Sequence, residues 1–138
     1  MIGSVAVSYP SSAYATCQTA ISDDRFVPGL RALADRIHEQ GACLAVQLVH
    51  DGANSLVDIA EGRPLLVPST PLRLRRDRRS SMVTPSEVAA MSRPFMSPTT
   101  ALSYWVADED DIIRVIAQLT DAADRARDAG LDRTARLR

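Results

Sequence analysis

The chain contains no lysine, and its 16 basic residues are all arginines. Within these residues, a Schiff-base lysine and a phosphate-loop lysine are therefore excluded. Aromatic residues make up only 4% of the 138 residues, so a core must be built from Ala, Val, Leu and Ile. No apolar run approaches the roughly 18 residues that cross a bilayer, and the amino terminus lacks the basic region of a secretory signal.

The low cysteine count and the small net charge exclude further classes of protein. Cys17 and Cys43 are too few for a disulfide framework or a cysteine metal cluster, and each is expected to be a reduced thiol. The formal net charge of −1 gives no general attraction to nucleic acid or to an anionic membrane. The motifs of α/β-hydrolases, dinucleotide-binding folds and zinc sites are also missing. We expect a cytoplasmic protein with no metal site, no nucleic-acid partner and no membrane partner.

The apolar pattern is typical of an α/β protein. Residues 2–7 form a short apolar stretch, as at the end of a buried strand. A helix is predicted to start near Ser22 and to stop at Gly41. Residues 42–49 follow at once as a nearly continuous apolar run, which indicates a strand covered on both faces. The predicted apolar stripe of the helix comprises Phe26, Leu30, Leu33, Ala34 and Ile37.

A second helix is predicted from about residue 109 to 128, with Gly130 as its stop. Its predicted buried stripe comprises Ile112, Ile113, Ile116, Leu119, Ala123 and Ala126. Residues 55–107 are expected to form a long irregular loop, with a short extended segment at 65–67 and a helix start at Thr84. No strand pattern follows Gly130, so residues 133–138 are predicted to be an unrelated basic tail.

Polar side chains gather where the predicted strand ends, which is where α/β folds place their chemistry. The amide of Gln47 is both a donor and an acceptor, which suits a ligand edge such as the pyrimidine part of a flavin. The alternative is a buried glutamine satisfied by neighbouring backbone. His50 is either an acid–base or ligand-shaping group or a structural histidine. His38, late in its helix, is expected to be structural.

Five arginines lie between residues 72 and 79. They could form a nucleic-acid patch, a grip on an anionic substrate such as a CoA phosphate, or a solvated loop. No aromatic residue is interleaved with them and the chain as a whole is not basic, so the solvated loop is favoured.

Several segments resemble the NADH:flavin oxidoreductase/old yellow enzyme family. Residues 22–54, with Gln-Leu-Val-His-Asp-Gly at the end of the apolar run, resemble the family's second helix and third strand. Residues 64–71 and 84–88 resemble its long loop after that strand, and residues 121–132 resemble its third helix and glycine turn. The sequence departs from the family at Ala53, where an arginine is expected.

The resemblance implies an α/β fold, namely an incomplete (β/α)8 TIM-barrel fragment that covers roughly the end of strand 2 through helix 3, within residues 1–132. It also implies FMN as cofactor, NAD(P)H as reductant and a small activated alkene as substrate, as in ene-reductases and 2,4-dienoyl-CoA reductases. By the same resemblance, Gln47 binds the flavin ring, Gly3 and Ser4 lie near it, and His50 lies toward the substrate.

The resemblance assigns no catalytic residue to this chain. The family's fourth strand carries a His/His or His/Asn pair that has no counterpart in residues 133–138. We therefore expect a partial oxidoreductase that is inactive alone and that self-associates through open sheet edges. The alternative is a small α/β interaction or regulatory module that acts by pairing with a partner chain.

Overall fold

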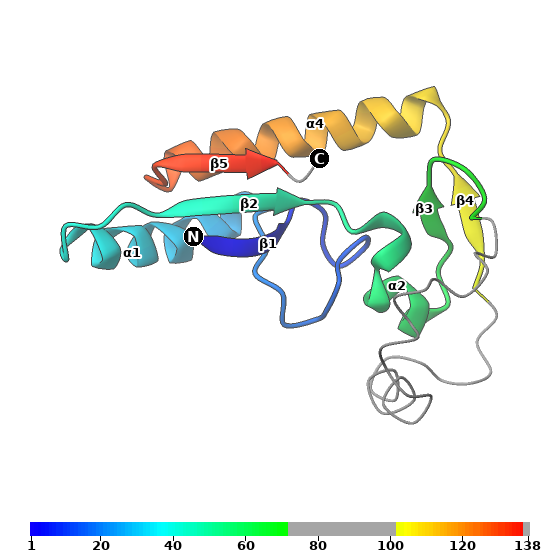
Figure 1. Ribbon diagram of the computed structural model, residues 1–138, viewed down its shortest axis with the longest axis horizontal. Helices are drawn as coiled ribbons and strands as arrows, with labels where there is room; N and C mark the ends of the chain where they lie inside the picture. Colours follow the sequence, from blue (N-terminus) through cyan, green and yellow to red (C-terminus); the bar gives the residue numbers. More distant parts are fainter. Residues whose placement is uncertain (72–101, 137–138) are drawn as a thin grey trace, which may run out of the picture.

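A computed structural model describes residues 1–71 and 102–136, which form two parallel sheets and their helices (Figure 1). The larger sheet has the order β1-β2-β5, with strands Ile2–Ala6, Ala45–Val49 and Arg133–Arg136. The smaller sheet pairs β3, Leu65–Val67, with β4, Tyr104–Val106. The α-helices are α1, Val27–His38; α2, Leu56–Glu61; and α4, Glu109–Asp128. Short 3-10 turns cover Asp24–Phe26 and Gly52–Asn54.

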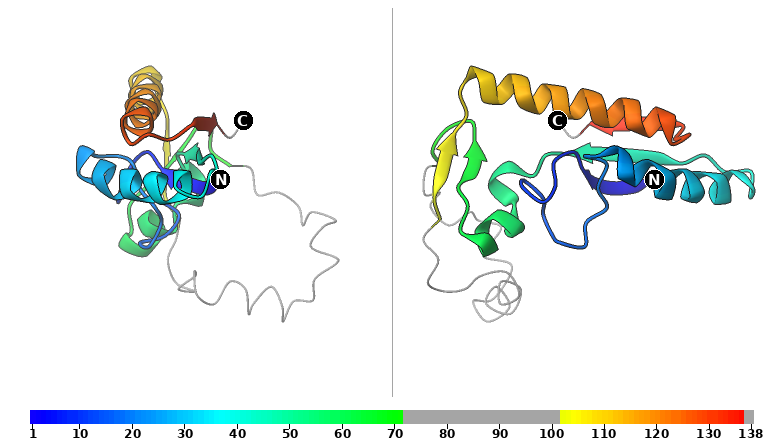
Figure 2. Two further views of the ribbon diagram at one scale, coloured as in Figure 1. Left: turned by 90° about the vertical axis from the view of Figure 1, so that its left-hand side faces the viewer. Right: turned by 180° about the vertical axis from the view of Figure 1, so that it is seen from behind.

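The main core lies between the larger sheet and the two long helices, α1 and α4, which run alongside it (Figure 2). Alternate residues of β2, Val46 and Leu48, are buried against these helices. Period-two alternation places Gln47 on the opposite face of the strand. The helices contribute small and branched side chains to this core: Leu30, Ala34, Ala122 and Ala126.

Both long helices end in the glycine stops that the sequence predicts. Gly41 has φ +73°, and its N–H donates to the carbonyl of His38 at 2.8 Å. The N–H of Ala42 reaches back to the carbonyl of Ile37 at 3.3 Å, which completes a Schellman motif. Gly130, with φ +78°, ends α4 with the same pair of bonds at 2.9 and 3.0 Å. Each motif turns the chain directly into a strand of the larger sheet.

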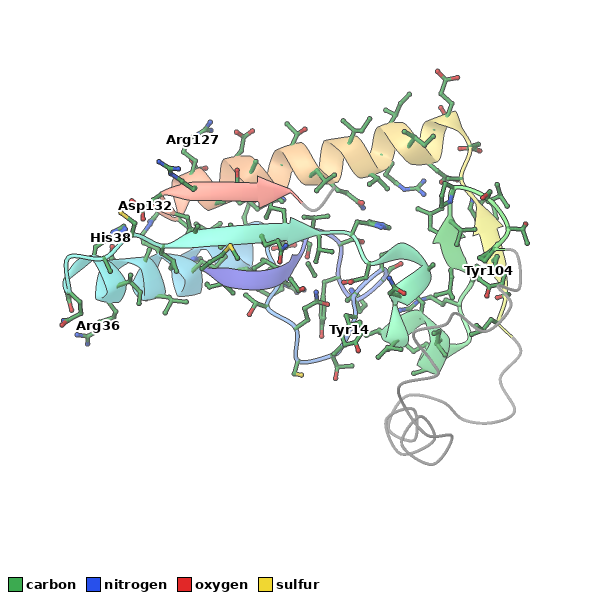
Figure 3. All side chains as sticks on the ribbon, in the orientation of Figure 1. Tyr14, Arg36, His38, Tyr104, Arg127 and Asp132 are labelled. Carbon is green, nitrogen blue, oxygen red and sulfur yellow. The ribbon has the colours of Figure 1, made fainter. Side chains whose placement is uncertain are left out.

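The two helix-to-strand turns are joined to each other. Asp132 Oδ2 accepts hydrogen bonds from the backbone N–H of Leu44 at 2.6 Å and from His38 Nε2 at 2.8 Å. The backbone N–H of Asp132 donates to the carbonyl of Leu44 at 2.9 Å. Figure 3 shows His38 and Asp132 side by side at this end of the sheet. His38 is therefore structural, as its position late in the helix suggests.

The expectation that no strand follows Gly130 is wrong, because β5 pairs in parallel with β2 from Arg133 to Arg136. A strand edge offers backbone N–H and C=O groups whatever side chains its partner carries. Asp132 sets the entry point, and the register then runs from Ala45 opposite Arg133 to Leu48 opposite Arg136. The apolar pattern was therefore a poor guide to this strand.

The predicted stripe of α4 is only partly correct. Ile112, Ile113 and Ile116 are 53%, 57% and 56% exposed, whereas Ala122 and Ala126 are buried. The apolar face of this helix is wider than the area that packs against the sheet. The part that packs against the sheet is the one that carries the small residues. In α1, Leu30 and Ala34 are buried as predicted, whereas Leu33 is exposed.

Residues 55–107 are less irregular than expected. The extended segment at 65–67 is confirmed as β3, but α2 and β4 also form there. The Ser55 hydroxyl caps α2 by accepting from the N–H of Asp58 at 3.2 Å. Residues 72–101, including the arginine run and the helix start predicted at Thr84, lie outside the described residues. In the described ranges, no helix is long and apolar enough to cross a membrane.

Candidate functional site

The structure brings Gln47 and Gly3 together on the face of the sheet that points away from α1 and α4. A Cβ atom placed on Gly3 would lie 3.6 Å from Gln47 Oε1, in ordinary van der Waals contact. Gln47 is partly buried, and its amide has no hydrogen bond to any described residue. A donor–acceptor amide therefore stands beside a residue that has no side chain.

Ser4 follows Gly3 in the chain, at an irregularity in β1. The register between β1 and β2 shifts between Ile2 and Val5, and Ser4 has φ +53°. Its carbonyl accepts from Gln18 Nε2 at 2.7 Å, and the same nitrogen donates to Asp51 Oδ2 at 3.1 Å. The irregular backbone at Ser4 is thus held by the loops that follow β1 and β2.

His50 is separated from Gln47, because it follows β2 on the side of the sheet that carries the helices. It lines a pocket of about 420 Å³ between the loop after β1, the end of β2, strand β4 and the first half of α4. Burial lowers the pKa of His50 below its usual value of 6.5, so the neutral imidazole is favoured at neutral pH. The structure therefore does not unite His50 with the Gly3–Gln47 pair in one site.

One wall of this pocket is built around Asp111, which the sequence analysis did not single out. Its Oδ2 accepts from Trp105 Nε1 at 2.6 Å and from the N–H of Asp108 at 3.2 Å. Its Oδ1 accepts from Arg114. The Trp105 bond is the main cause of its lowered pKa. The capping-box pattern at residues 108–111 was the available signal, but it indicated a helix start and not a pocket wall.

The opposite wall depends on Asp58, a buried carboxylate that the sequence analysis also missed. Asp58 Oδ2 accepts from the N–H of Ser12 at 2.7 Å, and Oδ1 accepts from Arg63 Nε at 2.7 Å. Ser12 has φ +57°, and its carbonyl accepts from the N–H of Asp51 at 3.0 Å. The loop that follows β1 is therefore fixed to α2 and to the end of β2.

The family model for NADH:flavin oxidoreductases and NADH oxidases matches residues 1–134 of this sequence. The chain belongs to this family. The match includes β1, β2 and α4, and it therefore contains all four predicted site residues: Gly3, Ser4, Gln47 and His50.

Two curated relatives are named as reductases. A metal reductase of Desulforamulus reducens is 29% identical over 132 residues, which cover 96% of this chain and 16% of that protein. A multifunctional alkene reductase/demethylase of Caballeronia cordobensis is 33% identical over 115 residues, which cover 83% of this chain and 14% of that protein. The chain thus spans only about a sixth of the length of these relatives.

A solved structure shows the same architecture. The Old Yellow Enzyme of a Pichia species matches 96% of this chain and 31% of its own chain, with a TM-score of 0.66 and 18% identity. This likeness confirms the α/β fold class and the arrangement as a segment of a (β/α)8 barrel. In such a barrel, the sheet face that lacks helices is the inner face, and Gln47 and Gly3 lie on it.

Proposed function

We propose that this chain supplies the part of an FMN-dependent NAD(P)H oxidoreductase that faces the flavin, with Gln47 as the residue that binds the ring. The observation that carries this proposal is the partly buried amide of Gln47, which lacks a partner among the described residues and stands beside Gly3. FMN, when bound, supplies hydride transfer between NAD(P)H and an activated alkene. The finer assignment, to ene-reductase or 2,4-dienoyl-CoA reductase chemistry, is part of this proposal.

The residues present fit one edge of a flavin. The Gln47 amide can donate to one ring carbonyl and accept from a ring N–H, and Gly3 and Ser4 leave backbone beside it. The family resemblance puts His50 toward the substrate, but we propose no role for it at the flavin, because it lines a pocket on the other side of the sheet from Gln47. We also propose that the chain alone does not turn over substrate, because the described residues hold the flavin ring through few groups. The two free, exposed cysteines fit the proposed cytoplasmic location.

Fluorescence quenching of FMN during titration with the purified chain tests the Gln47 assignment. We expect weak binding, with the flavin separating from the protein on gel filtration. Loss of one or two hydrogen bonds in Gln47→Leu should weaken the affinity by about tenfold. Gln40→Leu is the matched control, because Gln40 is exposed and lies in the turn after α1. Equal affinity of Gln47→Leu and the wild type, or no quenching at any FMN concentration, would overturn the proposal.

A second candidate function is pairing with another chain, which we take to be a second copy. It is favoured by the exposed isoleucines of α4 and by the outer edge of β5, which pairs with no described strand. Apolar side chains and open strand edges are both known routes to association.

Sedimentation velocity at several protein concentrations tests this pairing. We expect a concentration-dependent oligomer for the wild type and a monomer for the Ile112→Asp/Ile116→Asp double variant. Ala117→Asp is the control, since it adds the same charge at another exposed position of α4. A wild type that stays monomeric at every concentration would exclude this function.

A further inference from the structure

The pocket that His50 lines is a second site, distinct from the sheet face that carries Gln47. Its volume of about 420 Å³ falls within the range of small-molecule sites, roughly 300–1,000 Å³. It opens at the carboxyl ends of β1 and β2, and α4 closes one side. Because His50 lines this space together with residues of α4, and Gln47 stands on the sheet face away from that helix, a ligand here would not occupy the proposed flavin face.

Two side chains of the pocket, Gln118 and His50, form no hydrogen bond with another described residue. Gln118 Oε1 is buried and accepts no hydrogen bond, and a buried acceptor that stays unsatisfied destabilises the unliganded protein. The imidazole of His50 forms no hydrogen bond with another described residue, and its only backbone hydrogen-bonding contact is with its own main chain. In its neutral form it offers one N–H donor and one nitrogen acceptor. Gln118 and His50 come from different elements, α4 and the end of β2, and both line the same space.

The charged groups of the pocket neutralise each other. Arg114 donates to Asp111 from the same helix, so the pair adds no net charge to the pocket. Asp111 is further satisfied by Trp105 Nε1 at 2.6 Å. A charged ligand would therefore meet no net counter-charge from this pair, whereas a neutral ligand has no charge to compensate.

The remaining walls suit a flat apolar body. Pro64 and Leu66 supply apolar contacts, and the indole of Trp105 is held in place by its bond to Asp111. The loop that carries Ser11 and Ser12 supplies hydroxyl groups at the rim and is fixed through Asp58. A ligand with a planar apolar body and one amide edge would satisfy both the walls and the unpartnered polar groups.

We propose that this pocket binds a small, neutral, planar molecule with an amide edge, with its N–H donated to Gln118 Oε1 and its carbonyl accepting from His50. The site lies outside the proposed flavin face and does not depend on flavin binding. Gln118 and His50 determine its specificity for neutral amides over the corresponding acids.

NMR titration with benzamide tests the proposal, with benzoate as the charged comparison. The chain has only two histidines, so the ring signals of His50 can be assigned with a His50→Gln variant. Benzamide should shift the His50 signals and leave those of His38 unchanged, and benzoate should shift neither. Shifts of both histidines alike, of neither, or equal responses to benzamide and benzoate would overturn the proposal.

Variants of Gln118 give an independent measurement. Gln118→Met removes the unsatisfied oxygen while keeping the length of the side chain, so the variant is expected to fold. It should weaken benzamide binding about tenfold, and Gln40→Met should leave it unchanged. FMN quenching should be the same in Gln118→Met and the wild type, which separates this site from the proposed flavin site. Unchanged benzamide affinity in Gln118→Met would refute the assignment.

Discussion

Replacing Asp58 with asparagine should destabilise the fold through one defined defect. The carboxylate is 2% exposed and accepts from two donors on different elements, the N–H of Ser12 and the Nε of Arg63. Asparagine retains one acceptor oxygen but turns an NH2 group toward the other donor. One charge-assisted hydrogen bond is lost, which is worth about 1.5–3 kcal/mol. The Arg63 side chain is 34% exposed, so water screens part of that loss, and we expect about 2 kcal/mol.

Urea-induced unfolding followed by the fluorescence of Trp105, the single tryptophan, measures this loss. For a chain of this size, about 2 kcal/mol corresponds to a fall in Tm of roughly 8 °C. Amide hydrogen exchange should also quicken at Ser12, whose N–H donates to the carboxylate. Asp121→Asn, at an exposed position of α4, should change stability by less than about 0.5 kcal/mol. If Asp58→Asn matched that control, the carboxylate would not be holding the loop.

Three further predictions concern pH and backbone conformation. Burial lowers the pKa of His50 below 6.5, so the stabilising contribution of His50 is complete above pH 6.5. That contribution is lost as the pH falls through the pKa of the folded state, and His50→Gln should flatten this part of the plot of unfolding free energy against pH. The hydrogen bond from His38 is the main cause of the pKa of Asp132 lying below 3.8. The contribution of Asp132 to stability is therefore lost only at more acidic pH, and Asp132→Asn should remove this fall in the urea midpoint at low pH. Gly130→Ala should lower the free energy of unfolding by about 1 kcal/mol because φ is +78°, whereas Gly29→Ala inside α1 should raise it by about 0.5–1 kcal/mol. Thermal melts in which both variants shift Tm in the same direction would contradict this prediction.

The elements set by local signals could be predicted from the sequence. Gly41 and Gly130 mark the helix ends because only a left-handed residue completes a Schellman motif there. The apolar run that contains Gln47 indicates a strand buried among other elements, and β2 is the central strand of the larger sheet. The family resemblance, which several segments between residues 22 and 132 carry in order, is confirmed by the match over residues 1–134.

The features that depend on distant partners could not be predicted. β5 forms because the edge of β2 is available, and nothing in Arg133–Arg136 signals this. Helical periodicity places Ile112 and Ile116 on an apolar face, but it does not tell which part of that face meets the sheet. The role of Asp58 depends on a contact with the distant loop that holds Ser12. The role of Asp111 depends on Trp105, which comes from β4. The spacing from Ser55 to Asp58 was a usable signal for the N-cap of α2, but hydrophobic periodicity does not detect such a signal.

The middle place of β2 in the larger sheet has a consequence for evolution within the family. Main-chain bonds anchor this strand along both of its edges, so the position of Gln47 is set by backbone that side-chain changes elsewhere barely disturb. The segments that follow β1 and β2 can then vary in sequence while the position of the Gln47 amide on the sheet is kept.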